Sequence, residues 1–197
     1  MRLLVASKNR GKIKEIRSIV EGSVKVLSPL DLSLDLSILE DGNTLKENAI
    51  RKAALYFRAT GIVTLGEDTG LEVDFLRGRP GIYSARFSGG GDAENRKKLL
   101  DRLGKTENRA ARFRTVMILA LKDNWIECFE GILEGKIGRE ERGSGGFGYD
   151  SVFIPSGFKE TLAEMSDEEK NRISHRRLAL NKVLDFLERE RERVEEL

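Results

Sequence analysis

The stretch from Ile62 to Asp74, Ile-Val-Thr-Leu-Gly-Glu-Asp-Thr-Gly-Leu-Glu-Val-Asp, decides how the rest of the chain is interpreted. Its apolar, β-branched start predicts a buried strand over residues 62–65. Two carboxylates, Glu67 and Asp68, follow at the expected carboxyl end of that strand, before a hydroxyl residue and a glycine. Oxygen ligands of this kind suit a hard cation, Mg²⁺ above all. An acidic turn capped by Gly70 fits the same residues, so this stretch alone leaves both interpretations open.

The composition indicates a folded protein without a nucleic-acid or membrane partner. The chain has 197 residues, 39% hydrophobic and 35% charged. This length supports one α/β domain over residues 1–197, or one domain with two lobes. No apolar run approaches the length of a membrane span, and the apolar start is too short for a signal peptide. The 35 basic and 33 acidic residues leave a net charge of +2, whereas a protein that binds phosphate backbones needs a basic surplus.

A single cysteine, Cys128, excludes an intrachain disulfide. Its neighbours Trp125, Ile126 and Phe129 indicate a strand in which the thiol is buried and unreactive. Because nothing in the sequence calls for an oxidising environment, we expect a cytoplasmic protein.

Hydrophobic periodicity divides the chain into alternating strands and helices. Besides residues 62–65, strands are expected at residues 2–6, 24–27, 71–76, 112–121 and 125–137. Helices are expected at residues 12–20, from 44 to about 60, from an N-cap at Asp92 to about 103, in a short segment from 167, and at 176–194. Residues 29–39 alternate leucine with aspartate and serine, so they are either a strand or irregular. A hairpin at Lys122-Asp123-Asn124 would join the two longest strands. The order predicts an α/β fold with a mixed sheet flanked by helices.

The second expected helix has clear start and stop signals. The segment Thr44-Leu45-Lys46-Glu47 is a capping box, in which the threonine accepts from the Glu47 amide and the glutamate reaches back. Gly61 ends the helix. Its inward face is predicted to comprise Ile50, Ala53, Ala54 and Phe57. The helix also carries Lys52, and Glu40 lies in an acidic turn shortly before it.

The segment Ser7-Lys8-Asn9-Arg10-Gly11-Lys12 joins the first expected strand to the first expected helix. Free amides and the positive end of a helix dipole attract phosphate at such a junction. The segment is not a P-loop, because the glycine-rich spacing and the Gly-Lys-Ser/Thr ending are missing. A solvated helix cap explains the same residues, and this alternative stays open.

The second half of the chain offers groups that suit a base. Within Gly145-Gly146-Phe147-Gly148-Tyr149-Asp150 the glycines leave ring faces accessible for stacking, and the carboxylate can accept N–H groups. A glycine-rich hairpin with core aromatics is the alternative. The only histidine, His175, stands between Ser174 and Arg176. One histidine cannot make a histidine-rich metal site, and adjacent Ser and His do not form a triad, so hydrogen bonding to a ligand is the favoured role.

Taken together, these segments resemble the inosine triphosphate pyrophosphatase family, hydrolases of non-standard purine nucleoside triphosphates. The matching segments follow the family's order and span nearly the whole chain: residues 7–12, 47–53, 68–74, 80–86, 145–150 and 174–176.

The resemblance implies Mg²⁺-dependent hydrolysis of ITP, dITP and XTP between the α and β phosphates, giving a monophosphate and pyrophosphate. It implies that Glu40 and Asp68 hold the metal and that Asp68 accepts a proton from the attacking water. The triphosphate is assigned to Ser7, Lys8, Asn9, Arg10, Gly11, Lys12 and Lys52, with Thr69 beside them. The base is assigned to Phe147, Gly148, Tyr149, Asp150, Lys170, Ser174, His175 and Arg176. A homodimer with an elongated sheet and a cleft between two lobes is also implied.

The implied base preference has a physical reason. Inosine and xanthine carry an oxygen at position 6, to which His175 and Arg176 can donate. Adenine carries an amino group there, which would leave buried donors unpaired at roughly 1–3 kcal/mol per group.

Three residues depart from the family's usual pattern: Glu67 in place of aspartate, Thr69 in place of serine, and Ser151 in place of proline. The loss of the proline is expected to loosen the loop near the base. Two rival functions are a general nucleotide phosphatase that releases orthophosphate and a nucleotide-sensing or RNA-binding module. The base-binding residues argue against the first, and the carboxylates, which repel phosphate without a cation, argue against the second.

Overall fold

The acidic stretch forms one continuous strand. The computed structural model describes residues 1–20, 22, 24–122 and 125–195, and β3 spans Thr64–Val73. The strands expected at residues 62–65 and 71–76 are therefore a single element, and Glu67 and Asp68 lie inside it rather than in a turn. The expectation failed because Gly66 serves close packing instead of chain reversal: a Cβ there would lie 2.2 Å from the Ala49 carbonyl oxygen. A glycine in a strand often marks such an approach of two backbones.

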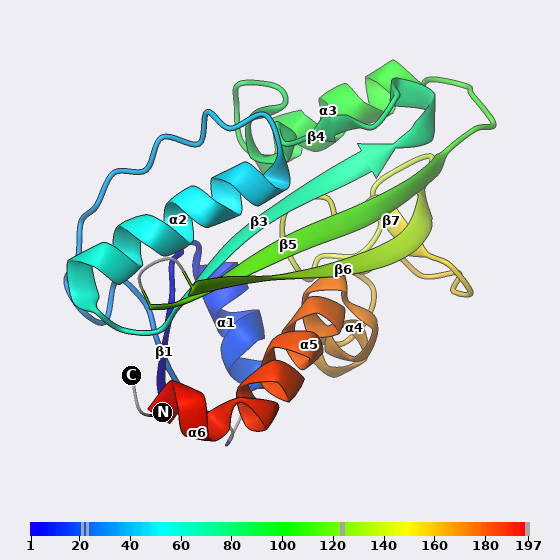
Figure 1. The fold of residues 1–197 in the computed structure, drawn as a ribbon. Helices are drawn as coiled ribbons and strands as arrows, with labels where there is room; N and C mark the ends of the chain where they lie inside the picture. Colours follow the sequence, from blue (N-terminus) through cyan, green and yellow to red (C-terminus); the bar gives the residue numbers. More distant parts are fainter. Residues whose placement is uncertain (21, 23, 123–124, 196–197) are drawn as a thin grey trace. The chain divides into compact units, whose positions relative to one another are not determined.

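The fold is the expected mixed α/β sheet with helices (Figure 1). The described strands are ordered β2-β1-β3-β5-β6-β7, and β4 pairs with β3. Strand β1 pairs in parallel with β2 and with β3. Strand β4 pairs antiparallel with β3, and β7 pairs antiparallel with β6. The remaining bounds are β1 Arg2–Val5, β2 Lys25–Leu27, β4 Arg79–Gly81, β5 Ala110–Lys122, β6 Trp125–Ile137 and β7 Phe153–Pro155.

The chain forms two compact units, which correspond to the two expected lobes. The first comprises Met1–Asp68, Thr115–Gly131 and Arg176–Leu197, and the second comprises Thr69–Arg114 and Ile132–His175. The first unit holds α1 Arg10–Ile19, α2 Leu45–Thr60, nearly all of α5 His175–Arg189, and α6 Arg191–Glu195. The second holds α3 Asp92–Leu103, α4 Asp167–Ile173 and the short 3₁₀ turns η1 Asp74–Leu76 and η2 Ser84–Arg86.

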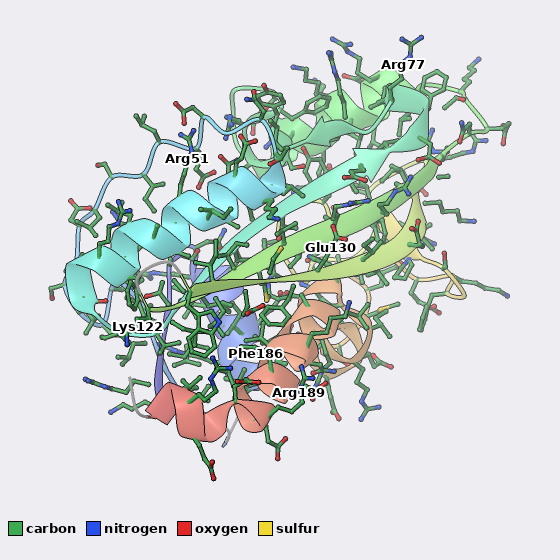
Figure 2. All side chains as sticks on the ribbon, viewed as in Figure 1. Arg51, Arg77, Lys122, Glu130, Phe186 and Arg189 are labelled. Carbon is green, nitrogen blue, oxygen red and sulfur yellow. The ribbon has the colours of Figure 1, made fainter. Side chains whose placement is uncertain are left out.

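The first unit has helices on both faces of its strands (Figure 1). Leu3 and Val5 of β1 pack in one apolar cluster with residues of α1 and α5, whereas Leu4 and Ala6 pack in another with Tyr56 of α2. This division follows from the alternation of side chains along a strand. The open question about residues 29–39 is resolved as a turn followed by irregular chain. Leu32, Leu34 and Leu36 of this segment pack against the cluster around Tyr56. On the other face lies Phe186 of α5, which is labelled in Figure 2. Its ring is 5.6 Å from that of Phe129.

The core of the second unit is built by strands and α3. Its buried members include Leu71 and Val73 of β3, Leu99 and Leu103 of α3, and Phe113 of β5. The rings of Phe113 and Phe153 lie 4.7 Å apart. This core supports the glycine-rich loop at residues 143–148, because Tyr149, which directly follows the loop, and Val152 belong to the same cluster.

Helix α2 has the expected ends but a different buried face. Thr44 accepts from the Glu47 amide, and Gly61 closes the helix at a φ of 64°. Glu47 reaches back to the amide of Asn43 rather than to that of Thr44. Of the four residues predicted to face inward, Ala53 is buried and the other three are partly buried; the buried face comprises Leu45, Asn48, Ala49, Lys52, Ala53 and Tyr56. An apolar pattern could not reveal this face because two of its members are polar.

Three further expectations need correction. Cys128 is exposed, because in β6 it shares the accessible side with Ile126. The expected helix over residues 176–194 is divided at Glu190 into α5 and α6. Gly91 rather than Asp92 is the N-cap of α3. The expected hairpin falls partly on residues 123 and 124, which lie outside the described residues. Among the described helices none has both the length and the apolar character needed to cross a membrane.

Candidate active site

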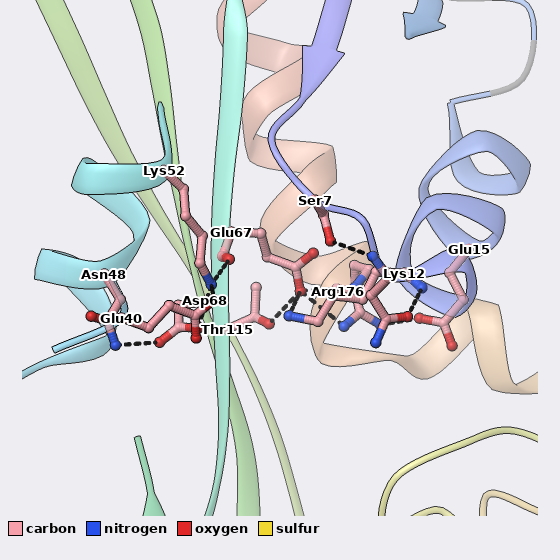
Figure 3. A network of polar contacts seen from close by, with 11 residues as sticks. Ser7, Lys12, Glu15, Glu40, Asn48, Lys52, Glu67, Asp68, Thr115 and Arg176 are labelled. Atoms are coloured by element: carbon pink, nitrogen blue, oxygen red, sulfur yellow. Dashed lines mark hydrogen bonds and ion pairs between the residues drawn. The ribbon is translucent and has the colours of Figure 1, made fainter. Parts of the chain in front are cut away.

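Asp68 lies on β3 between two donors of α2 (Figure 3). Lys52 Nζ is 2.8 Å from Asp68 Oδ1 and 2.9 Å from Glu40 Oε1. Asn48, one helical turn before Lys52, donates its side-chain amide to Asp68 Oδ2 at 3.1 Å. Residues four apart on a helix share a face, so α2 supplies a donor to each oxygen of Asp68. Burial lowers the pKa of Lys52, but the charges of Asp68 and Glu40 outweigh it, so the pKa is raised above its ordinary value.

The pair of Glu40 and Asp68 fits a hard divalent cation. Both carboxylates converge on one position, at present that of the Lys52 ammonium group. Across the described part of the chain, no group of three or more His, Cys, Asp and Glu side chains is arranged to hold a metal by itself. Mg²⁺ is usually bound by one or two carboxylates together with water and substrate phosphates. The two carboxylates are therefore a sufficient protein contribution for Mg²⁺, provided that a phosphate ligand completes the set.

The neighbouring Glu67 is fully buried and engaged by an arginine (Figure 3). Arg176 of α5 places Nε 3.0 Å and Nη2 2.9 Å from Glu67 Oε1, and its Nη1 pairs with Glu15 of α1. The carboxylates of Glu67 and Glu15 outweigh the lowering effect of burial, so the pKa of Arg176 is raised. Thr115 Oγ1 also approaches Glu67 Oε1, at 3.4 Å. Arg176, assigned to the base by resemblance, thus lies in the first unit and joins two carboxylates.

Residues 7–12 form the expected strand-to-helix junction. Asn9 is the N-cap of α1 and accepts from the Lys12 amide at 3.1 Å. Ser7 accepts from the Asn9 amide at 3.2 Å. Lys12 Nζ lies 3.5 Å from Glu67 Oε1, and burial lowers the pKa of this lysine. The helix cap is therefore confirmed, and the Arg10 and Gly11 amides belong to the first turn of α1. Lys8 instead pairs with Asp35.

Two groups of ion pairs hold the acidic side chains of the first unit that were singled out above. Lys52 pairs with Glu40 and Asp68, while Glu67 pairs with Lys12 and with Arg176, which also pairs with Glu15. Carboxylates repel a triphosphate unless a cation lies between them and the phosphates.

In the second unit, Asp150 organises the glycine-rich loop. Its Oδ2 accepts from Lys170 Nζ at 2.7 Å and from the Phe147 amide at 2.9 Å. Lys170 Nζ lies 4.9 Å from the centroid of the Phe147 ring, a cation–π distance. Gly146 has a φ of 71°, and a Cβ there would lie 2.1 Å from Asp150 Oδ2. The loop therefore presents Phe147 with both its amide and one ring face fixed.

Other predicted residues of the second unit are placed as follows. His175 is buried and stacks on Phe113, with ring centroids 4.8 Å apart and planes inclined by 17°. Ser174 is the C-cap of α4 and is buried. The Tyr149 hydroxyl donates to the Ser84 carbonyl at 2.8 Å, and burial raises the pKa of that phenol. Tyr149 thus anchors the loop to η2.

Each unit gathers its own set of predicted residues. The first brings together Glu40, Lys52, Asp68 and Lys12, and the second brings together Phe147, Asp150 and Lys170. Thr69 follows Asp68 on β3 and begins the second unit. Four contributors were not singled out from the sequence: Glu15, Asn48, Phe113 and Thr115. For Glu15 the sequence offers one signal of a buried charge, because this residue stands between Ile13 and Ile16, two apolar residues of the same expected helix.

Comparison with known proteins identifies the family. The profile of the Ham1 family matches residues 3–186. A dITP/XTP pyrophosphatase of Christiangramia forsetii is 43% identical over 189 residues, which cover 95% of this chain and 99% of that protein. One from Elusimicrobium minutum is 46% identical over 192 residues, covering 93% and 98%.

Solved structures agree with this result. The Staphylococcus aureus Ham1 protein has a TM-score of 0.86 and 38% identity, covering 96% of this chain and 100% of that one. A HAM1 protein from Coxiella burnetii has a TM-score of 0.87 and 34% identity, covering 96% and 99%. These matches confirm the resemblance seen in the motifs, and the chain belongs to the Ham1 family.

Proposed function

We propose that this chain, working over residues 1–197 as one functional domain, hydrolyses ITP, dITP and XTP to the monophosphate and pyrophosphate. The observation that carries the proposal is the convergence of Glu40, Lys52 and Asp68 at 2.8–2.9 Å on one position. The relatives named dITP/XTP pyrophosphatase support the same substrate class.

Glu40 and Asp68 would hold Mg²⁺, which would supply charge neutralisation on the phosphates. Without a cation between them, the two carboxylates would repel the phosphates, which supports the need for Mg²⁺. Lys52 would exchange part of its contact with the two carboxylates for a phosphate oxygen. Lys12, with the amides at the start of α1 and the side chains of Ser7 and Asn9, would bind the remaining phosphate oxygens.

Asp68 would accept a proton from the water that attacks the α phosphorus. As the new phosphorus–oxygen bond forms, the bond from the α phosphorus to the bridging oxygen breaks, and pyrophosphate leaves. Asn48 would orient Asp68 for this step, because its amide binds the oxygen that Lys52 does not. Such a reaction depends on positioning and charge more than on covalent catalysis.

Phe147 would stack on the purine, since Asp150 and Lys170 fix its amide and one ring face. Lys170 and His175 would donate to the oxygen at position 6, and Asp150 would accept a base N–H. Adenine presents an amino group at that position, which leaves these donors unpaired.

We further propose a homodimer, and a cytoplasmic location where nucleotide pools reside. The single cysteine is consistent with a reducing compartment.

The test is product analysis of the purified chain with Mg²⁺ and equal concentrations of ITP, XTP, ATP and GTP. We expect pyrophosphate and monophosphate from the first two, little from the others, and no turnover when a chelator replaces Mg²⁺. Asp68→Asn should lower kcat by roughly 10²–10⁴-fold if Asp68 is the proton acceptor. Asp41→Asn is the matched control, because Asp41 is an exposed carboxylate paired with Arg51 outside the cluster.

The outcomes separate the candidate functions. Orthophosphate from all four nucleotides would favour a general phosphatase. Nucleotide binding without any turnover would favour a sensing module. Equal kcat values for Asp68→Asn and Asp41→Asn would remove Asp68 from the role of proton acceptor.

A further inference from the structure

We propose that helix α3 positions the glycine-rich loop that carries Phe147. Through this loop, Asp92 and Arg96 of α3 act as specificity-determining residues without touching the substrate. This inference rests on the proposed function, because it takes Phe147 as the residue that stacks on the base. Neither residue stands in the motifs that carry the family resemblance.

Both residues bind the peptide groups of Gly148, which directly follows Phe147. Asp92 Oδ2 accepts from the Gly148 amide at 2.8 Å. Arg96 Nη1 donates to the Gly148 carbonyl oxygen at 2.9 Å. Asp92 and Arg96 are four residues apart and so lie on one face of α3. The helix thus binds both polar backbone groups of one loop residue.

These bonds complete the fixation of Phe147. The Phe147 amide donates to Asp150 Oδ2 at 2.9 Å. The next residue, Gly148, is held by the two side chains of α3. Gly148 has a φ of 62°, although a Cβ there would meet nothing within 4 Å. The glycine is therefore needed for its backbone conformation, and that conformation directs its amide and carbonyl to the two side chains of α3.

A third contact involves the position where the family usually has proline. Ser151 donates its hydroxyl to Glu141 Oε2 at 3.0 Å. The same oxygen accepts from Arg96 Nε at 2.7 Å. Glu141 therefore joins Ser151 to Arg96, which also binds Gly148. At this position, where the resemblance predicts a looser loop, the Ser151 hydroxyl links the loop through Glu141 to the contacts of α3.

Arg96 is well placed for this role because it is largely shielded from solvent. Its side chain is 19% exposed, compared with 40% for Glu141. A hydrogen bond from a charged donor to a carbonyl oxygen is stronger than one from a neutral donor. The next residue, Lys97, is exposed and carries the same charge, so it supplies a matched control on the same helix.

The experiment measures kcat and KM for ITP, XTP and GTP, together with inhibition by inorganic triphosphate, which has no base. The variants are Arg96→Ala, Arg96→Lys, Asp92→Asn, Ser151→Ala and the control Lys97→Ala. Arg96→Ala should raise KM for ITP by roughly fivefold or more, with a smaller change in kcat, as expected for a lost hydrogen bond from a charged group. The inhibition constant of inorganic triphosphate should stay unchanged, and Lys97→Ala should behave as the wild type.

The conservative variants distinguish positioning from folding. Arg96→Lys can reach the Gly148 carbonyl or Glu141 but not both, so it should recover part of the KM for ITP. Asp92→Asn retains an acceptor for the Gly148 amide and should also fall between wild type and Arg96→Ala. Ser151→Ala should shift KM in the same direction by a smaller factor. A thermal unfolding midpoint measured for each variant reports any general loss of folding.

Failure of this inference can be told from failure of the proposed function. A wild type that does not hydrolyse ITP would overturn the proposed function. A wild type that hydrolyses ITP, with Arg96→Ala indistinguishable from Lys97→Ala, would overturn the role of α3 alone. A weaker binding of inorganic triphosphate equal to the rise in KM for ITP would also overturn it, because the effect would then not concern the base.

Discussion

Replacing Arg176 by methionine tests whether this arginine is the counter-ion of two buried carboxylates. The side chain of Arg176 is 2% exposed, that of Glu67 is 0% exposed, and that of Glu15 is 10% exposed. Methionine fills much of the volume but removes the guanidinium charge that both carboxylates share. Removing one member of a buried ion pair costs roughly 3–5 kcal/mol, since an uncompensated charge remains in the interior.

The assay is urea unfolding followed by the fluorescence of Trp125, the only tryptophan in the chain. Trp125 reports the first unit because its ring lies 6.4 Å from that of Phe186 of α5. With a denaturant dependence of about 2–3 kcal/mol per M, the unfolding midpoint should fall by about 1–2 M urea. Arg17→Met is the control: Arg17 pairs with Asp31 on the surface of the same unit, and exposed pairs contribute little.

A double-mutant cycle with Glu15→Gln tests whether the loss of stability comes from the ion pair between Glu15 and Arg176. The free energies of unfolding should show a coupling of about 1 kcal/mol or more between Glu15 and Arg176, because the two side chains are in direct contact. Arg176→Lys should be intermediate, as one ammonium group cannot serve two carboxylates in the geometry of a guanidinium. If Arg176→Met unfolds at the same urea concentration as Arg17→Met, the counter-ion role is wrong.

Four further predictions concern single positions. Thr44→Ala should reduce the free energy of unfolding by about 0.5–2 kcal/mol through loss of the α2 cap, measured by urea unfolding; no change would contradict the cap. Gly66→Ala should cost about 1–3 kcal/mol or more by overpacking against the Ala49 carbonyl, and a wild-type unfolding midpoint would refute the close contact. Cys128 is exposed as a residue, but partial burial of its sulfur raises the pKa of the thiol, so alkylation by iodoacetamide should keep accelerating above about pH 8.5, the ordinary thiol value; a plateau below that pH would contradict it. Phe113→Leu removes the ring on which His175 stacks and should raise KM for ITP by about two- to tenfold, whereas an unchanged KM would exclude that role.

The parts of the fold that the sequence predicts well are those governed by local rules. Thr44 and Gly61 mark the ends of α2 because a side-chain cap and a left-handed glycine act over a few residues. The glycine-rich loop at residues 143–148 is likewise a local property of its composition. The long segments of β5 and β6, with their β-branched and aromatic residues, also predict strands.

The parts that the sequence does not predict depend on what lies across the fold. Nothing near Gly66 in the chain indicates that Ala49 will pack against it, so a strand glycine resembles a turn. The buried face of α2 includes Asn48 and Lys52, whose burial makes sense only beside Asp68. Cys128 has apolar neighbours in sequence, yet its side of β6 is the exposed one.

The strand geometry of the acidic pair explains why two adjacent carboxylates have different partners. Side chains alternate along a strand, so Glu67 and Asp68 point to opposite faces of β3. Asp68 meets α2, where Lys52 and Asn48 bind it. Glu67 meets α1 and α5, where Lys12 and Arg176 bind it and its side chain has no exposure to solvent.

This separation supports Asp68 rather than Glu67 as the proton acceptor in the proposed hydrolysis. A proton acceptor must reach water, and the Asp68 side chain retains 9% exposure next to Glu40, which is 39% exposed. Glu67 has no such access, so its charge serves to hold Lys12 and Arg176 in place. In a turn, both acids could have faced the same side and repelled each other. The continuous strand permitted by Gly66 therefore supports the proposed role of Asp68 in the reaction, and it places Glu67 where it holds the neighbouring cations.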